Sequence, residues 1–71
     1  MEQNTAMEII SLSQKYTLSI EEASVYFGIG QHKLSKIVNE NRNADFVLWL
    51  GTRARIKRKL FEEYVDRCTA I

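Results

Sequence analysis

The sequence has little of what most metal sites and covalent cross-links are built from. Among its 71 residues there is one cysteine and one histidine. A single cysteine cannot form an intramolecular disulfide, and one cysteine with one histidine falls short of the ligand set of a structural zinc site. We interpret Cys68 as a small core residue, with a reactive thiol as the alternative. We expect neither a metal nor another cofactor.

Signatures of catalysis are also lacking. The sequence has no phosphate-binding glycine loop, no cysteine–histidine pair in a nucleophile arrangement and no converging set of carboxylates. Because no group is placed to attack a substrate or to exchange protons with it, we expect a protein that has no catalytic residues and is not an enzyme.

Long apolar runs are missing as well. No stretch approaches the roughly 18 apolar residues that cross a bilayer, and the N-terminus lacks the positive-then-apolar pattern of a secretory signal. We therefore expect a cytoplasmic protein with no membrane partner. A hydrophobic content of 45% is that of a folded chain, and 71 residues allow one small domain.

Charge is distributed unevenly, although the net charge is only +1. Residues 28–59 contain eight basic and two acidic residues, a balance of +6, whereas the rest of the chain has two basic and seven acidic residues, a balance of −5. A basic segment between acidic flanks indicates a localised anionic partner, with the acidic parts turned away from it. Nucleic acid fits this pattern best.

The N-terminal third contains a weak segment and then a clear helix start. Residues 1–15 mix polar and scattered apolar side chains, which is typical of a flexible or weakly helical arm. Tyr16-Thr17-Leu18 predicts a short edge strand. Ser19 and Glu22 then have the spacing of a capping box, in which each side chain bonds the other's backbone amide and so begins a helix.

A second helix follows after a short turn. Gly28 suits the left-handed cap of the first helix, and Gly30 can begin the next segment without steric penalty. From residue 31 to 41 the apolar side chains form one stripe, and the opposite face is polar. Two short helices joined by a tight turn predict a helix-turn-helix, whose second helix is the usual reader of the DNA major groove.

The basic run from Arg53 to Lys59 predicts one strand of a hairpin. An apolar segment, Phe46–Leu50, precedes a Gly51-Thr52 turn. Alternation places Arg53, Arg55 and Lys57 on one face and Ala54 and Ile56 on the other. A row of basic side chains on a strand is suited to phosphate binding, whereas a solvated charged edge is the alternative when the run is considered alone.

Two hairpin registers remain open. A two-residue loop pairs Leu50 with Arg53 and places Val47 and Trp49 on the face of Ala54 and Ile56. An odd-length loop places Phe46 and Leu48 on that face instead and exposes Trp49 near the tip. Trp49 is thus either a core residue or an intercalating residue of the wing tip.

A last helix is expected from about Arg58 to the end of the chain. Phe61, Tyr64, Val65 and Cys68 form an apolar stripe, with acidic residues outside it. Strand, two helices, hairpin and final helix make a small α+β winged-helix domain, which we assign to residues 16–71 with residues 1–15 as an N-terminal arm.

Several segments between Lys15 and the end of the chain, taken in order, resemble one known family. These segments are Tyr16–Ser24, Tyr26-Phe27, Ile29-Gly30, Lys33-Leu34, Asn41–Ala44, Gly51, Arg53, Ile56–Lys59, Phe61-Glu62 and Ala70-Ile71. Through them the chain resembles the small excisionases of conjugative transposons, also called recombination directionality factors. Their winged-helix domain is similar to the DNA-binding domains of MerR regulators.

The resemblance implies a sequence-specific accessory protein that bends double-stranded DNA at the ends of a mobile element and promotes its excision by a tyrosine-family integrase. It also implies cooperation between neighbouring copies on the DNA and, in a bacterium, association with the nucleoid. The implied DNA-binding residues lie on the second helix and on the wing: Gln31, His32, Lys33, Ser35, Lys36, Thr52, Arg53, Arg55, Lys57 and Arg58. In the family, positions 35 and 36 are both basic, and the departure at Ser35 bears on target preference and affinity.

Two other functions use the same pattern. A small winged-helix transcription regulator is the first alternative, and the absence of a coiled-coil helix after the domain favours the accessory factor over it. A protein-interaction adaptor that grips an acidic partner is the second, although an adaptor has no need of a polar recognition face together with a cationic wing.

Overall fold

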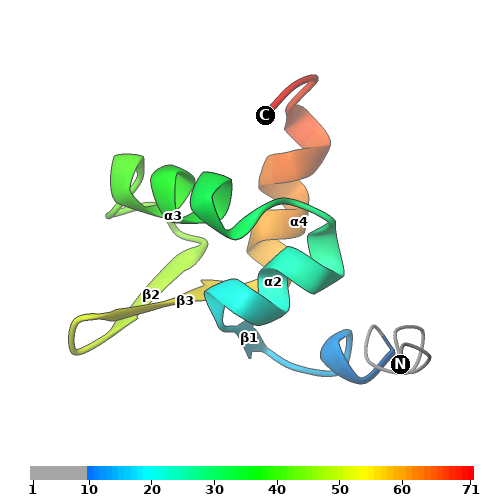
Figure 1. Ribbon diagram of the computed structural model, residues 1–71, viewed down its shortest axis with the longest axis horizontal. Helices are drawn as coiled ribbons and strands as arrows, with labels where there is room; N and C mark the ends of the chain where they lie inside the picture. The colour runs from blue at the N-terminus through cyan, green and yellow to red at the C-terminus, as the bar shows by residue number, and fades with distance from the viewer. Residues whose placement is uncertain (1–9) are drawn as a thin grey trace.

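The computed structural model describes residues 10–71, and the predicted arm therefore lies mostly outside the described residues (Figure 1). Of that arm, Leu12 is 8% exposed and belongs to the hydrophobic core. The elements follow in the order β1 (Thr17–Leu18), α2 (Ile20–Phe27), α3 (Gln31–Glu40), β2 (Val47–Leu50), β3 (Arg53–Lys57) and α4 (Arg58–Arg67). This is the predicted winged-helix order, with the β2–β3 hairpin as the wing.

The capping box and the glycine turn are confirmed. The Glu22 amide donates to Ser19 Oγ at 3.1 Å, and the Ser19 amide donates to Glu22 Oε1 at 3.0 Å. At the other end of α2, Gly28 has a φ of 69° and its amide donates to the Ser24 carbonyl. Because this conformation strains residues with a Cβ, Gly28 ends α2 and lets α3 begin three residues later.

The three strands form one antiparallel sheet in the order β1-β3-β2. Leu50 pairs with Arg53 and Trp49 with Ala54, so the two-residue loop is the correct alternative and the odd-length loop is wrong. Gly51 has a φ of 64°, and no described residue other than glycine has a positive φ. A glycine at the first central position is what a type II′ hairpin turn requires.

The core lies between the sheet and the three helices. Leu18, Leu34, Ile56 and Phe61 are fully buried. Phe61 packs edge-on against Phe27 and Phe46, with ring centroids 4.9 and 5.0 Å apart. The predicted aromatic stripe of α4 therefore packs on α2 and on the segment before β2.

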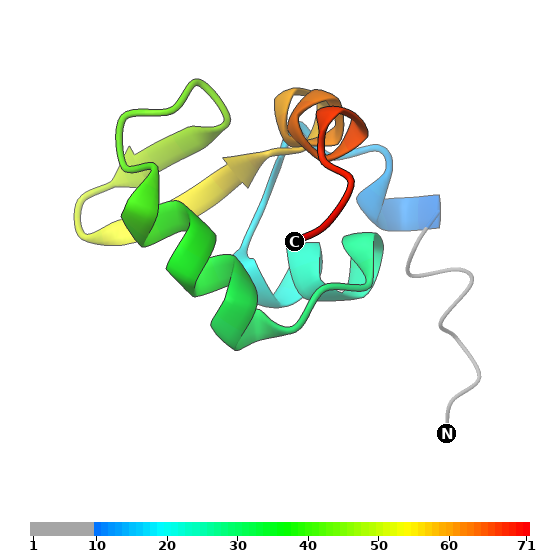
Figure 2. The ribbon, with the colours of Figure 1, turned by 90° about the horizontal axis from the view of Figure 1, so that it is seen from above.

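The final helix is shorter than predicted. It ends at Arg67, and Cys68 is extended, with φ −91° and ψ 140°. The chain then turns back toward α3, where Lys33 Nζ donates to the main-chain oxygen of Ile71 at 3.0 Å (Figure 2). Cys68 is only partly buried, which corrects its assignment to the core: it lies after the last helical turn, where the apolar stripe has ended.

Candidate nucleic-acid interface

The exposed face of α3 follows from the burial of its opposite face. Leu34, Ile37 and Val38 are buried in the core. Since successive side chains project around the helix at about 100° intervals, the residues on the side opposite these three face solvent. Of the predicted α3 contacts, Gln31, His32, Lys33 and Lys36 are exposed, whereas Ser35 is partly buried.

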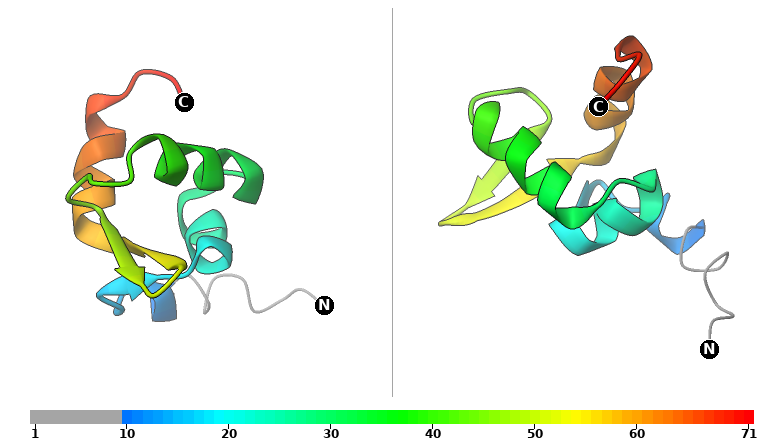
Figure 3. Two further views of the ribbon diagram at one scale, coloured as in Figure 1. Left: turned by 90° about the vertical axis from the view of Figure 1, so that its left-hand side faces the viewer. Right: turned by 45° about the horizontal axis from the view of Figure 1, so that its top comes forward.

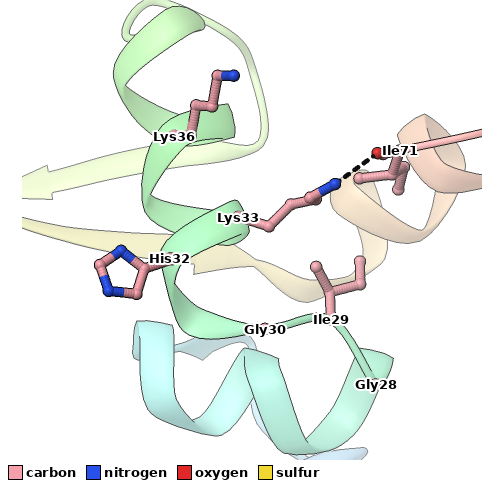
Figure 4. A pocket seen from close by; sticks show the side chains of 7 residues that line it. All are labelled: Gly28, Ile29, Gly30, His32, Lys33, Lys36 and Ile71. Carbon is pink, nitrogen blue, oxygen red and sulfur yellow. Dashed lines mark hydrogen bonds between the residues drawn. The ribbon is translucent and has the colours of Figure 1, made fainter.

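The exposed α3 residues do not all point the same way. His32, Lys33 and Lys36 border an open hollow of about 750 Å³ with Ile71 and the Gly28–Gly30 turn. Figure 4 shows that Lys33 extends toward Ile71, while His32 points to the other side of the helix. His32 and Lys36 are therefore presented to solvent, and Lys33 is engaged by the C-terminal segment.

The wing presents a smaller set of residues. Thr52 and Arg53 are exposed at its tip. In Figure 1 the hairpin projects to the left, away from α4, and α3 lies above it. The left-hand view of Figure 3 likewise shows the hairpin and α3 facing the same side.

Arg55 has partners inside the protein. Its Nε donates to Thr17 Oγ1 at 3.1 Å and its Nη2 donates to the Thr17 carbonyl at 3.2 Å. Nη2 also lies 3.7 Å from Glu22 Oε1. The guanidinium thus ties β3 to β1 and to the first turn of α2.

Glu22 is the charged centre of this contact. Lys15 Nζ lies 2.5 Å from Glu22 Oε2. The hydrogen bond from Lys15 holds the pKa of the Glu22 carboxyl below its ordinary value, helped by the Ser19 amide and by the charges of Lys15 and Arg55, and opposed by partial desolvation. The carboxylate stays ionised and retains both cations.

Arg58 is also engaged internally. Its side chain is 17% exposed, and its Nη1 donates to Glu62 Oε2 at 2.9 Å. Its Nε donates to the Lys15 carbonyl at 3.0 Å. Lys57, which precedes α4, is partly buried. The three C-terminal members of the predicted wing contacts, Arg55, Lys57 and Arg58, are therefore less accessible than Arg53, and their contact with DNA stays a prediction.

Two residues of this surface, Arg42 and Leu50, were not among the contacts predicted from the sequence. Arg42, after α3, stacks on Trp49, with its Cζ 4.2 Å from the ring centroid, and the Trp49 Nε1 donates to the Arg42 carbonyl at 3.0 Å. Leu50 is 56% exposed at the wing tip. The only signal for either residue was the two-residue-loop alternative, because that register decides where Trp49 and Leu50 lie.

Residues 10–71 contain no group of three or more histidine, cysteine or acidic residues that could hold a metal ion. Within the same residues, no helix has the length and apolar character that a membrane span requires.

Comparison with known proteins agrees with the geometry of a DNA-binding winged helix. Residues 3–71 match the family model described as the excisionase from transposon Tn916. An excisionase from transposon Tn916 in Streptococcus agalactiae serotype V is 48% identical over 62 residues, which cover 87% of this chain and 92% of that protein. The family predicted from the sequence is thereby confirmed, and the chain belongs to the family of the Tn916 excisionase.

Proposed function

We propose that this protein is a DNA-binding accessory factor that promotes excision of a mobile element by an integrase, and that residues 16–71 are its DNA-binding domain. One observation supports it most directly: α3, with its exposed residues Gln31, His32 and Lys36, and the exposed wing tip lie toward the same side of the molecule. A recognition helix and a wing can then contact one duplex together.

Within this proposal the two elements have different tasks. Gln31, His32 and Lys36 reach base edges and phosphates in the major groove, and Ser35 lies beside them. Thr52 and Arg53 contact a phosphate or the minor groove next to it. Lys33 joins the interface when it leaves the main-chain oxygen of Ile71.

Arg55, Lys57 and Arg58 act mainly behind the interface. The hydrogen bonds of Arg55 hold β3 against β1. Those of Arg58 tie the first turn of α4 to the Lys15 carbonyl and to Glu62. They position the wing, and their charge adds to the positive potential that attracts DNA. This division assigns the direct wing contacts to Arg53 and Thr52.

The finer points of the function rest on the family and on the charge distribution. We assign sequence-specific binding at the ends of the element, bending of the DNA, a tyrosine-family integrase as partner and cooperation with neighbouring copies. Binding to chromosomal DNA would place the protein at the nucleoid. The exposed acidic residues of α4, Glu63 and Asp66, lie outside the basic segment, where they can face a protein partner without repelling DNA.

Fluorescence anisotropy with a labelled duplex from the element's end tests the proposal. Neutralising about 4 to 6 phosphates predicts a log–log salt slope of roughly −4 to −5. Arg53→Ala should weaken binding and lower the slope by about one. Arg67→Ala, the same change at an exposed arginine of α4, is the control and should leave both unchanged.

Two results would contradict the proposal. The first is binding that does not depend on salt, and the second is equal affinity for the end sequence and for a scrambled duplex. An excision assay with the integrase of the element completes the test: DNA binding without any stimulation of excision would favour a transcription regulator.

A further inference from the structure

The tip of the wing carries an apolar side chain that the fold does not bury. Leu50 is 56% exposed, and it comes directly before the Gly51-Thr52 turn. The other exposed large apolar residues in the described chain are Ile10, Tyr16, Val25 and Ile71, none of which belongs to the hairpin. A single exposed leucine is ordinary on a protein surface, and Leu50 differs from such a residue in its surroundings.

The nearest neighbour of Leu50 on the partner strand is a cation. Leu50 pairs directly with Arg53, and residues opposite one another in an antiparallel pair project from the same face of the sheet. Arg53 and Thr52 are both exposed. The tip therefore presents one apolar side chain beside one positive charge, a combination suited to a surface that is anionic outside and apolar within.

Contacts on both strands of the hairpin hold the tip in place. Trp49 cannot swing outward without breaking the hydrogen bond from its indole N–H to the Arg42 carbonyl and its stacking with the Arg42 guanidinium. At its other end, β3 is bound to β1 through the pairs Thr17–Lys57 and Leu18–Ile56. Trp49, the sequence-based candidate for intercalation, is thus retained by Arg42, and Leu50 is the exposed apolar residue of the tip.

We propose that Leu50 is a wedge that enters the minor groove of bound DNA and partly unstacks one base step. This inference rests on the proposed DNA-binding function and deepens it by naming the residue that bends the duplex. Proteins that kink DNA from the minor groove insert apolar side chains between base pairs, and the bend allows more protein surface to contact the duplex. Arg53 binds the adjacent phosphate and holds the leucine in the groove.

The wedge predicts which sequence is preferred under the wing. Pyrimidine–purine steps such as TA and CA unstack most easily. A site with such a step below the tip should be bound more tightly than one without it, although leucine forms no hydrogen bond to a base. The wing then contributes specificity through the deformability of the DNA.

Base unstacking can be measured directly. One set of duplexes has the sequence of the element's end and carries 2-aminopurine at a single adenine, a different adenine in each duplex. A second set carries a fluorescent donor and acceptor at its two ends, so that energy transfer reports the end-to-end distance. The wild-type protein should increase 2-aminopurine fluorescence at one step and shorten the end-to-end distance. Leu50→Ala should lose most of both signals, while Leu50→Phe should retain them.

Val25→Ala is the matched control, because it shortens an exposed apolar side chain on α2 and should behave like wild type. The wedge is disproved if no position responds to the wild-type protein, or if Leu50→Ala keeps the fluorescence change and the bend. Unchanged DNA signals with weaker integrase binding in Leu50→Ala would assign the leucine to a protein contact instead. Failure of the wild-type protein to bind the duplex at all would refute the proposed function itself.

Discussion

Arg53 and Arg55 show how differently two side chains of one strand can be used. Both project from the same face of β3, and both are charged. Arg53 is exposed at the tip and forms no ion pair with another described residue, whereas Arg55 binds Thr17 and lies beside Glu22. The side chain of Arg55 is 29% exposed, so its interactions are only partly screened by water.

Replacing Arg53 should therefore affect DNA binding, whereas replacing Arg55 should affect stability. Arg53→Ala should weaken DNA binding and leave the melting temperature almost unchanged, as is usual for exposed positions. Arg55→Ala should lower the free energy of unfolding by about 1–2 kcal/mol because its hydrogen bonds are lost. Each kcal/mol lowers the melting temperature by about 4–8 °C in a domain of this size.

Thermal unfolding and anisotropy of the same two variants check this prediction. Equal losses of DNA affinity, with no loss of stability in Arg55→Ala, would show that Arg55 leaves Thr17 and Glu22 to bind DNA.

Glu22 makes the free energy of unfolding depend on pH. Its pKa is lower in the folded protein than its ordinary value of 4.5, so the unfolded chain takes up a proton at a higher pH than the folded one. The stabilisation is complete above the unfolded value and is lost as the pH falls through the folded value. Glu22→Gln can keep the capping box, since glutamine also serves at this position, but it lacks the charge.

Urea unfolding at pH 7 and at about pH 3 measures this difference. The wild-type protein should be more stable than Glu22→Gln at pH 7, and the difference should shrink at the acidic pH. Glu63→Gln, at an exposed position of α4, is the control. A difference that is the same at both pH values would mean that the charge of Glu22 contributes nothing.

Among the elements, α3 and the wing are joined by the contact between Arg42 and Trp49. Arg42 Nη1 also donates to Asn39 Oδ1 at 3.3 Å, which links the guanidinium to the last turn of α3. The contact spans the loop between α3 and the hairpin. In the proposed complex with DNA, this contact would set the angle at which both elements meet the duplex.

Weakening this contact should loosen the wing without unfolding the protein. Arg42→Ala removes the stacked guanidinium, and Arg42→Lys keeps the charge but loses the planar group. Because Trp49 is the only tryptophan, its fluorescence reports the change: both variants should shift its emission toward that of a water-exposed indole. DNA affinity should fall in both, whereas a loss in Arg42→Ala alone would assign Arg42 to a phosphate contact.

At the scale of the whole molecule, one aromatic ring connects the parts. Phe61 is fully buried and packs on Phe27, Phe46 and Tyr64. A domain of this size is stabilised by only about 4–10 kcal/mol. The packing of this ring therefore contributes a large share of the free energy that holds α4 against the rest of the fold.

Phe61→Ala should cost about 3–5 kcal/mol through lost burial and a remaining cavity. Thermal unfolding followed by circular dichroism should show a melting temperature far below that of the wild-type protein, and DNA binding should be lost at temperatures where the variant unfolds. Phe61→Leu fills most of the volume and should stay folded with reduced stability. Full stability of Phe61→Ala would contradict the central position of this residue.

The sequence by itself determined the elements, their order and the basic segment. The capping box of Ser19 and Glu22, the glycine after α2 and the alternation in β3 are local signals, each contained within a few residues. The resemblance to excisionases was carried in part by the same residues, and the family match confirms it.

Only the tertiary structure decided the hairpin register, the end of α4 and the partners of the basic residues. Arg55 meets Thr17 across 38 residues of chain, and Arg58 meets Lys15 across 43. Such contacts depend on how the elements pack, and packing leaves no periodic pattern in the sequence. A run of basic residues was therefore recognisable as a wing, while its division into exposed Arg53 and internally bound Arg55 and Arg58 required the folded chain.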